Sequence, residues 1–125
     1  MECSKHTHCI KRYLKMNDFK EYQEQALRTA NVNDPKERII MNAVLGLNGE
    51  SGEIADSIKK TLYQGHKDNR EHLIEELGDV LWYVSLMAYG LNVSLSEVAE
   101  RNISKLMTRY PKGFDAEKSK NRKED

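Results

Sequence analysis

The chain has 125 residues, with 20 Lys and Arg balanced by 20 Asp and Glu, so its formal net charge is zero. This length fits one domain, and the balanced charge gives no overall field that would steer the protein onto nucleic acid or an anionic membrane. The longest apolar stretch, residues 80–87, is far shorter than the about 20 residues of a membrane span. We therefore expect a cytoplasmic protein with no nucleic-acid partner and no membrane partner.

Composition favours helices around a small core. Hydrophobic residues make up 38% of the chain and charged residues 32%, a balance typical of amphipathic helices. There are only two Pro and no long alternating run of Val, Ile or Thr, so the sequence predicts an all-α fold. Cys3 and Cys9 are too close in sequence for a disulfide to hold the fold together.

Apolar periodicity and capping residues divide the chain into four predicted helices. Asp18 is a good N-cap for the first, Asp34 followed by Pro35 opens the second, Asn92 stops the third, and Ser94 begins a capping box for the fourth. The predicted helices cover residues 19–30, 35–63, 69–91 and 95–110. They form one domain, residues 17–114, between a flexible N-terminal tail (1–16) and a charged, disordered C-terminal tail (115–125).

Three glycines lie inside the second predicted helix, at Gly46, Gly49 and Gly52. Each costs about 1 kcal/mol relative to Ala in a helix interior. Their presence indicates that another part of the molecule approaches the helix backbone closely at these positions.

Two pairs of carboxylates carry the candidate chemistry: Glu50 with Glu53, and Glu76 with Asp79. The members of each pair are three residues apart, so each pair projects from one face of its helix. In an antiparallel hairpin of the second and third helices, the two pairs would lie at similar heights and face each other. Converging carboxylates repel one another, and a hard cation such as Mg²⁺ or Mn²⁺ would neutralise them. The alternative is that they are solvated faces of charge-rich helices.

The fourth predicted helix carries Asn102, Lys105 and Arg109 on one stripe. A metal held by carboxylates opposite basic donors suits a polyphosphate, because the cation bridges phosphate oxygens and Lys or Arg neutralises the rest. Interhelical salt bridges would need the same residues. Lys60 is a further candidate for phosphate binding, or else part of a solvated face.

Three segments resemble a known family. The runs at residues 45–60 (LGLNGESGEIADSIKK) and 75–83 (EELGDVLWY) look like the two halves of the signature of MazG-type nucleoside triphosphate pyrophosphohydrolases, with 22 residues between Glu53 and Glu76. The segment at residues 102–111, which begins at Asn102 and ends in Arg-Tyr-Pro, is similar to a further part of the family pattern. The resemblance covers about residues 19–114.

The resemblance implies a four-helix MazG-like bundle that is completed by homo-oligomerisation as a dimer or tetramer. It also implies Mg²⁺-dependent hydrolysis of a (deoxy)nucleoside triphosphate to the monophosphate and pyrophosphate, in nucleotide-pool house-cleaning. Carried over to this chain, the catalytic and metal-binding residues are Glu50, Glu53, Glu76 and Asp79. By the same comparison, Asn102, Lys105 and Arg109 contact phosphate and Tyr83 lies near the nucleoside.

Three alternatives stay open from the sequence. A helical interaction module without activity would use the same acids as salt-bridge partners. A phosphoribosyl-ATP pyrophosphohydrolase would share the helical layout and the metal-binding acids. A nucleotide-binding regulator would keep the site but turn over no substrate.

Overall fold

The computed structural model describes residues 15–122, which form five helices and no strand. The helices are α1 (Phe19–Leu27), α2 (Lys36–Tyr63), α3 (Arg70–Gly90), α4 (Leu95–Arg109) and α5 (Ala116–Lys120). The predicted all-α fold is confirmed. Cys3, Cys9 and most of the predicted N-terminal tail lie outside the described residues.

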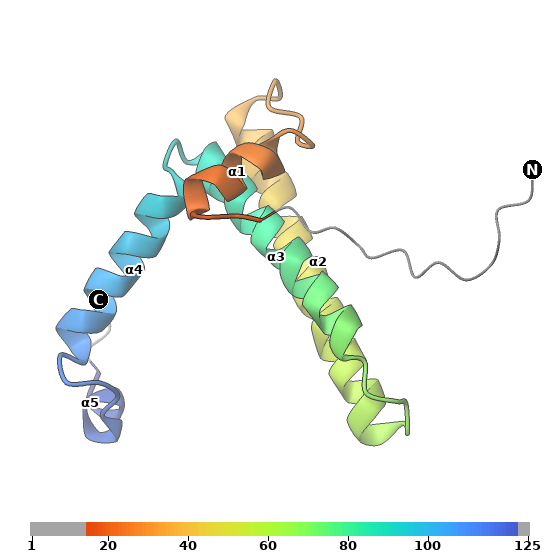
Figure 1. Cartoon of the computed structure of the whole chain (residues 1–125), viewed down its shortest axis with the longest axis vertical. Coiled ribbons are helices and arrows are strands. Elements are labelled where there is room, and N and C mark those ends of the chain that lie inside the picture. Colours follow the sequence, from red (N-terminus) through yellow and green to blue (C-terminus); the bar gives the residue numbers. More distant parts are fainter. Residues whose placement is uncertain (1–14, 123–125) are drawn as a thin grey trace, which may run out of the picture.

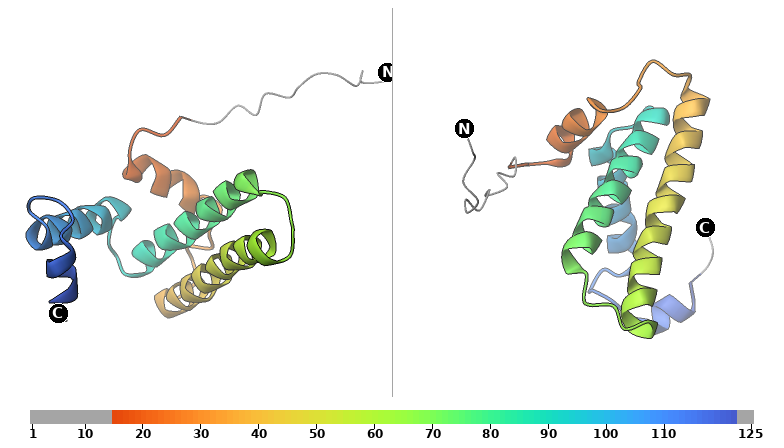
Figure 2. Two further views of the ribbon diagram at one scale, coloured as in Figure 1. Left: turned by 90° about the horizontal axis from the view of Figure 1, so that it is seen from below. Right: turned by 90° about the vertical axis from the view of Figure 1, so that its right-hand side faces the viewer.

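The dominant unit is an antiparallel hairpin of α2 and α3, which lie side by side along their length in both figures (Figures 1 and 2). The shorter α1 packs across α3 and α4. From there α4 diverges from the hairpin, which gives the chain the outline of an inverted V in Figure 1. The described part of one chain is therefore a hairpin with two attached helices, and completion of a four-helix bundle by another subunit stays a prediction.

The hydrophobic core lies at the end of the hairpin nearest α1. Ile39 and Ala43 of α2 are buried against Leu86 of α3, and Leu27 and Ala30 pack against this group. Lower on the hairpin, toward the α2–α3 turn, apolar and polar side chains are both partly buried, among them Ile54, Leu73 and Glu76. The buried apolar side chains of α2 and α3 thus lie at the end of the hairpin nearest α1.

Two polar side chains fix α1 on the hairpin. The Trp82 indole Nε1 donates to the Ala26 carbonyl at 3.1 Å and to the Thr29 hydroxyl at 2.9 Å. Buried Gln23 donates to the Ser85 carbonyl at 3.3 Å and accepts from the Leu95 backbone N–H at 2.9 Å. Because Gln23 contacts both α3 and the first residue of α4, it helps to set where α4 begins.

The turn between α3 and α4 follows the predicted signals. Asn92 adopts the left-handed conformation (φ 58°), and the backbone N–H groups of Asn92 and Val93 donate to Tyr89 and Ala88, as in a Schellman motif. Ser94 accepts a hydrogen bond from the Glu97 N–H, so the predicted cap is confirmed. The Glu97 carboxylate pairs with Arg101 instead of closing the capping box.

Other helix boundaries differ from the prediction. The first helix ends at Leu27 rather than Ala30, because residues 28–30 form a tighter turn in which the Thr29 N–H donates to the Ala26 carbonyl. Asp34 does not cap α2. The cap is the extended residue Pro35, which makes no side-chain hydrogen bond, and the Asp34 carboxylate lies 4.0 Å from Arg38.

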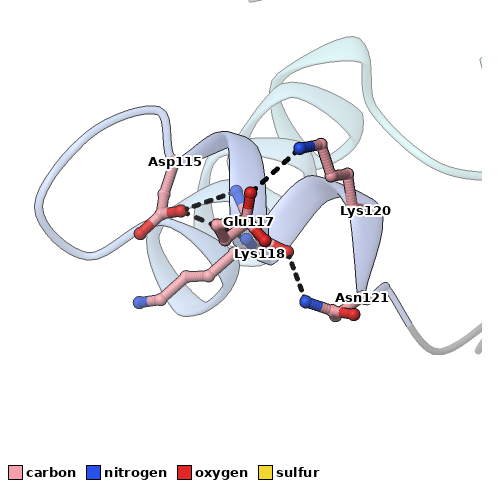
Figure 3. Close-up of polar contacts among 5 residues, drawn as sticks. All are labelled: Asp115, Glu117, Lys118, Lys120 and Asn121. Carbon is pink, nitrogen blue, oxygen red and sulfur yellow. Dashed lines mark hydrogen bonds and ion pairs between the residues drawn. The ribbon is translucent and has the colours of Figure 1, made fainter.

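Within the C-terminal segment, for which disorder is predicted, residues 116–120 form α5 (Figure 3). Asp115 accepts hydrogen bonds from the backbone N–H groups of Glu117 and Lys118, which satisfies the first turn. The Glu117 carboxylate pairs with Lys120 at 2.9 Å, and its carbonyl accepts from the Asn121 amide. Local capping and ion pairing therefore order a segment whose charge alone suggested disorder.

Close approach to the α2 backbone occurs at one of the three predicted glycines. A Cβ atom at Gly46 would lie 2.1 Å from Cε1 of Tyr83, so the aromatic ring rests directly on the α2 backbone. Around Gly49 and Gly52, no described heavy atom would lie within 4 Å of such a Cβ. The prediction is right at Gly46 and wrong, within one chain, at Gly49 and Gly52.

We expect Gly46→Ala to destabilise the protein by about 1–3 kcal/mol, because the new methyl group overlaps the Tyr83 ring. Gly49→Ala is the matched control, and it should stabilise α2 by up to about 1 kcal/mol because it restores helix propensity in open space. Urea denaturation in chelator would measure both changes. Equal effects of the two substitutions would show that the ring does not depend on Gly46.

Candidate metal and nucleotide site

Three carboxylates converge between α2 and α3. One oxygen atom from each of Glu50, Glu76 and Asp79 lies within 4.8 Å of the others. The antiparallel pairing of the two helices brings position 50 level with positions 76 and 79. The predicted meeting of acids from the two helices therefore occurs for these three residues.

The neighbouring carboxylates change the pKa of Glu50. The pKa of Glu50 is raised above its ordinary value of 4.5, first because it shares a hydrogen bond with Glu76, and further because of burial and the negative charges of Asp79, Glu76 and Glu53. A shared proton between two carboxylates is the expected response of an acidic cluster without a counterion.

Glu76 is largely enclosed, with only 12% of its side chain exposed. Its Oε1 lies 3.3 Å from Nε2 of His72, one turn earlier on α3. Its Oε2 is buried and has no hydrogen-bond partner among the described residues. A buried carboxylate oxygen without a partner is costly unless something else binds it.

These features fit a divalent cation. The donor set is entirely carboxylate oxygen, which hard ions such as Mg²⁺ and Mn²⁺ prefer. A cation would relieve the repulsion on Glu50 and bind the unpartnered Glu76 oxygen.

Two predicted site residues on α2, Glu53 and Lys60, lie outside this cluster. Glu53 is exposed, three residues after Glu50 on the same face of the helix, and its oxygens are not among the three that meet. Its charge nevertheless raises the pKa of Glu50. Lys60 forms an ion pair with Asp56, which also pairs with Lys59, and these two lysines hold the pKa of Asp56 at about 2.

The predicted substrate-binding residues of α4 are Asn102, Lys105 and Arg109. They lie on the helix that diverges from the hairpin, so the described part of one chain does not bring them to the cluster (Figure 1). Tyr83 packs between α2 and α3, with its ring against Gly46 and edge-on to Trp82 at 4.9 Å between centroids. Within one chain Tyr83 acts as a packing residue.

An open, mostly apolar cavity of about 820 Å³ lies among α1, α3 and α4. Phe19 and Tyr22 of α1, Leu81 of α3 and Ile103 of α4 contribute to its lining. Tyr22 connects the cavity with the acidic cluster, because burial and the charge of Asp79 together raise the pKa of its hydroxyl. An apolar cavity beside a metal-binding cluster can hold the organic part of a charged ligand.

His72 is a site residue that the sequence patterns did not single out. His72 precedes Glu76 by four residues, so their helical spacing is a signal that could have identified the pair. Nothing in the spacing of Tyr22 relates it to Asp79, because α1 and α3 meet only through tertiary packing.

Comparison with known proteins places the chain in a family. The MazG nucleotide pyrophosphohydrolase domain matches residues 40–114, more than half of the chain, and the protein belongs to this family. A relative, the Gene 37 protein of Mycobacterium phage L5, is 47% identical over 73 residues, which are 55% of this chain and 64% of that protein. The chain thus spans less than two thirds of this relative. No solved structure matches the chain.

The matched segment contains both halves of the carboxylate cluster and all of α4. The roles of individual residues in it stay predictions. None of the helices in the described part of the chain combines the length and apolar character that crossing a bilayer requires.

We expect Glu50→Gln to raise the melting temperature of the protein in chelator at neutral pH. The pKa of Glu50 is raised in the folded state, so its ionisation above pH 4.5 lowers folding stability progressively until the raised pKa is passed. A neutral amide removes that repulsion. Thermal unfolding between pH 4 and pH 8 in chelator would measure the effect.

The same variant should lose stabilisation by Mg²⁺. Wild-type protein would gain about 2.7 kcal/mol at a Mg²⁺ concentration 100 times the dissociation constant, and Glu50→Gln much less. Glu24→Gln, an exposed substitution on α1, is the control and should respond to Mg²⁺ as wild type does. If Mg²⁺ stabilised Glu50→Gln as much as wild type, Glu50 would not be a ligand of the cation.

Proposed function

We propose that the protein hydrolyses a (deoxy)nucleoside triphosphate to the nucleoside monophosphate and pyrophosphate, with Mg²⁺ or Mn²⁺ as cofactor. The observation that carries this proposal is the convergence of Glu50, Glu76 and Asp79 inside a MazG domain. A role in clearing surplus or non-standard nucleotides from the cytoplasm agrees with such an activity.

Glu50, Glu76 and Asp79 would hold the cation. Glu53 is exposed on the same face of α2, so a side-chain rotation would bring it in as a fourth ligand. When bound, the cation supplies positive charge that polarises the phosphate oxygens. His72 supports the arrangement by holding one oxygen of Glu76, which orients the carboxylate toward α2.

The apolar cavity among α1, α3 and α4 would receive the nucleoside. The charge of Asp79 acts on the Tyr22 hydroxyl in the lining of the cavity, so a nucleotide with its base against α1 would direct its phosphates toward the cluster. Phe19 and Tyr22 offer aromatic surfaces for a base.

Asn102, Lys105 and Arg109 would contact phosphate from a second subunit. In one chain α4 diverges from the hairpin, and large apolar side chains are exposed on α2, α3 and α4, for example Leu45 (65%), Leu77 (58%) and Met107 (67%). Burial of these side chains in a homodimer or homotetramer would complete the bundle and bring a neighbouring α4 to the hairpin.

The proposed activity predicts that Glu76→Gln lowers pyrophosphate release by more than about 100-fold, because it removes the charge of a largely enclosed carboxylate of the cluster. Glu53→Gln should also abolish turnover while the fold is kept. A panel of canonical and modified NTPs and dNTPs with Mg²⁺ is the assay, with chromatographic separation of monophosphate from diphosphate products. Melting temperature in chelator is the control for folding.

Absence of monophosphate and pyrophosphate from every nucleotide would contradict the proposal. Binding of nucleotide without turnover would favour a regulator. Hydrolysis of phosphoribosyl-ATP and of no other nucleotide would identify the protein as a phosphoribosyl-ATP pyrophosphohydrolase.

The proposed assembly predicts a mass in solution of two or four times the 14.5 kDa chain. Met107→Lys should raise the dissociation constant of the oligomer by about tenfold, because it places a charge at an apolar position. Thr108→Lys adds the same charge at the next residue of α4 and is the control. Light scattering across a dilution series would measure both, and a monomer at every concentration would contradict the assembly.

A further inference from the structure

A second cavity lies at the turn between α2 and α3. Its volume is about 250 Å³, and polar side chains dominate its lining. The lining residues used below are Ser57, Lys60, His66, Lys67, Asp68 and Asn69. It shares no lining residue with the apolar cavity beside α1, and the function proposed above assigns it no ligand.

Ser57 supplies a buried hydroxyl without a partner. The residue is 8% exposed, and its Oγ has no hydrogen-bond partner among the described residues. The neighbouring Thr61 hydroxyl is already used, because it donates to the Ser57 carbonyl at 3.2 Å. A buried hydroxyl that lines a polar cavity is a hydrogen-bond donor available to a ligand.

The N-terminus of α3 adds backbone donors on the opposite side. Asn69 is the cap residue of this 21-residue helix and makes no side-chain hydrogen bond to the first turn. First-turn N–H groups have no partner inside a helix, and the helix dipole makes this end favourable for an anion. Lys67 and His66 lie in the preceding turn, where Gly65 adopts a positive φ of 69°.

Charge in the lining is mixed. Lys60 and Lys67 are cationic, while Asp68 is the carboxylate of the lining and Asp56 already pairs with Lys60. A ligand that accepts hydrogen bonds from Ser57, Lys67 and the α3 backbone at once fits these donors better than a cation would. Phosphate oxygens, which accept several hydrogen bonds and carry negative charge, have this chemistry.

The cavity lies in line with the carboxylate cluster. Ser57 follows Glu50, the α2 member of the cluster, by seven residues on the same face of the helix, about 10 Å along the helix axis. On α3, Asn69 precedes His72 by three residues and His72 precedes Glu76 by four, so the same face runs from the cavity to the cluster. A phosphate chain held at the carboxylates and extended along the groove would point into the cavity.

We propose that this cavity binds the terminal phosphate of the triphosphate and then the pyrophosphate product, through Ser57, Lys60, Lys67 and the N-terminus of α3. This inference rests on the proposed function. It gives the leaving group a binding site within the same chain that is separate from the basic residues of α4.

Calorimetric titration of sodium pyrophosphate into the full-length protein in chelator tests the site, because without a cation the carboxylate cluster repels the anion. Wild type should bind pyrophosphate saturably, with one site per chain. Lys67→Gln and Lys60→Gln should each weaken binding by about tenfold, and Ser57→Ala by about threefold. Ser57→Ala removes no hydrogen bond donated by that side chain, so its melting temperature should be unchanged.

Lys59→Gln is the matched control. Lys59 also pairs with Asp56 but does not line the cavity, so its removal should leave pyrophosphate binding within about twofold of wild type. Equal losses in Lys59→Gln and Lys60→Gln, or no saturable binding by wild type, would overturn the proposal. Nucleotide hydrolysis without pyrophosphate binding would contradict the pyrophosphate site in the cavity and would support the proposed function. Pyrophosphate binding without hydrolysis of any nucleotide would contradict the proposed function and would show that the cavity is an oxyanion site.

Discussion

Repulsion among three carboxylates, held within 4.8 Å of one another by the pairing of α2 with α3, is the constraint on which the rest of this structure depends. The core at the α1 end of the hairpin supports that pairing: Ile39, Ala43 and Leu86 are buried there, and Gly90 lets α3 approach Ile40 closely. The core thus stabilises one end of the hairpin, and the like charges meet near its middle. A site that is unfavourable without its ligand is typical of proteins that bind cations.

Helix existence and the two carboxylate pairs could be predicted from the sequence because both depend on local spacing. Asn92 and Ser94 end and begin helices through hydrogen bonds within a few residues, and the three-residue spacing of Glu76 and Asp79 fixes a common face. The direction of α4 could not be predicted, because it depends on Gln23, which contacts residues 62 and 72 positions away. The missing cap at Asp34 and the order of α5 likewise followed from geometry that composition does not contain.

The glycines show that a sequence pattern can predict a close approach correctly at one position and wrongly at the next. Gly46 allows the Tyr83 ring to rest on the backbone, whereas Gly49, Gly52 and Gly78 face open space in one chain. The last three are close to Glu50 and Asp79 in sequence, but neighbouring positions lie about 100° apart around a helix axis, so this open space is not the space at the carboxylates. Sequence spacing identifies glycines inside a helix, but it cannot tell which of them another side chain contacts and which face open space.

The hairpin of α2 and α3 changes character along its length, and under the proposed function this order would constrain how a nucleotide lies against it. From the core toward the turn come apolar side chains, then the carboxylates, then the polar cavity at Ser57. The proposed substrate has the same order: an aromatic base, an inner phosphate at which the bond would be cleaved, and terminal phosphates that would leave. The reverse orientation would place the terminal phosphates against the mostly apolar lining of the cavity among α1, α3 and α4. Desolvation of the phosphates would oppose that orientation.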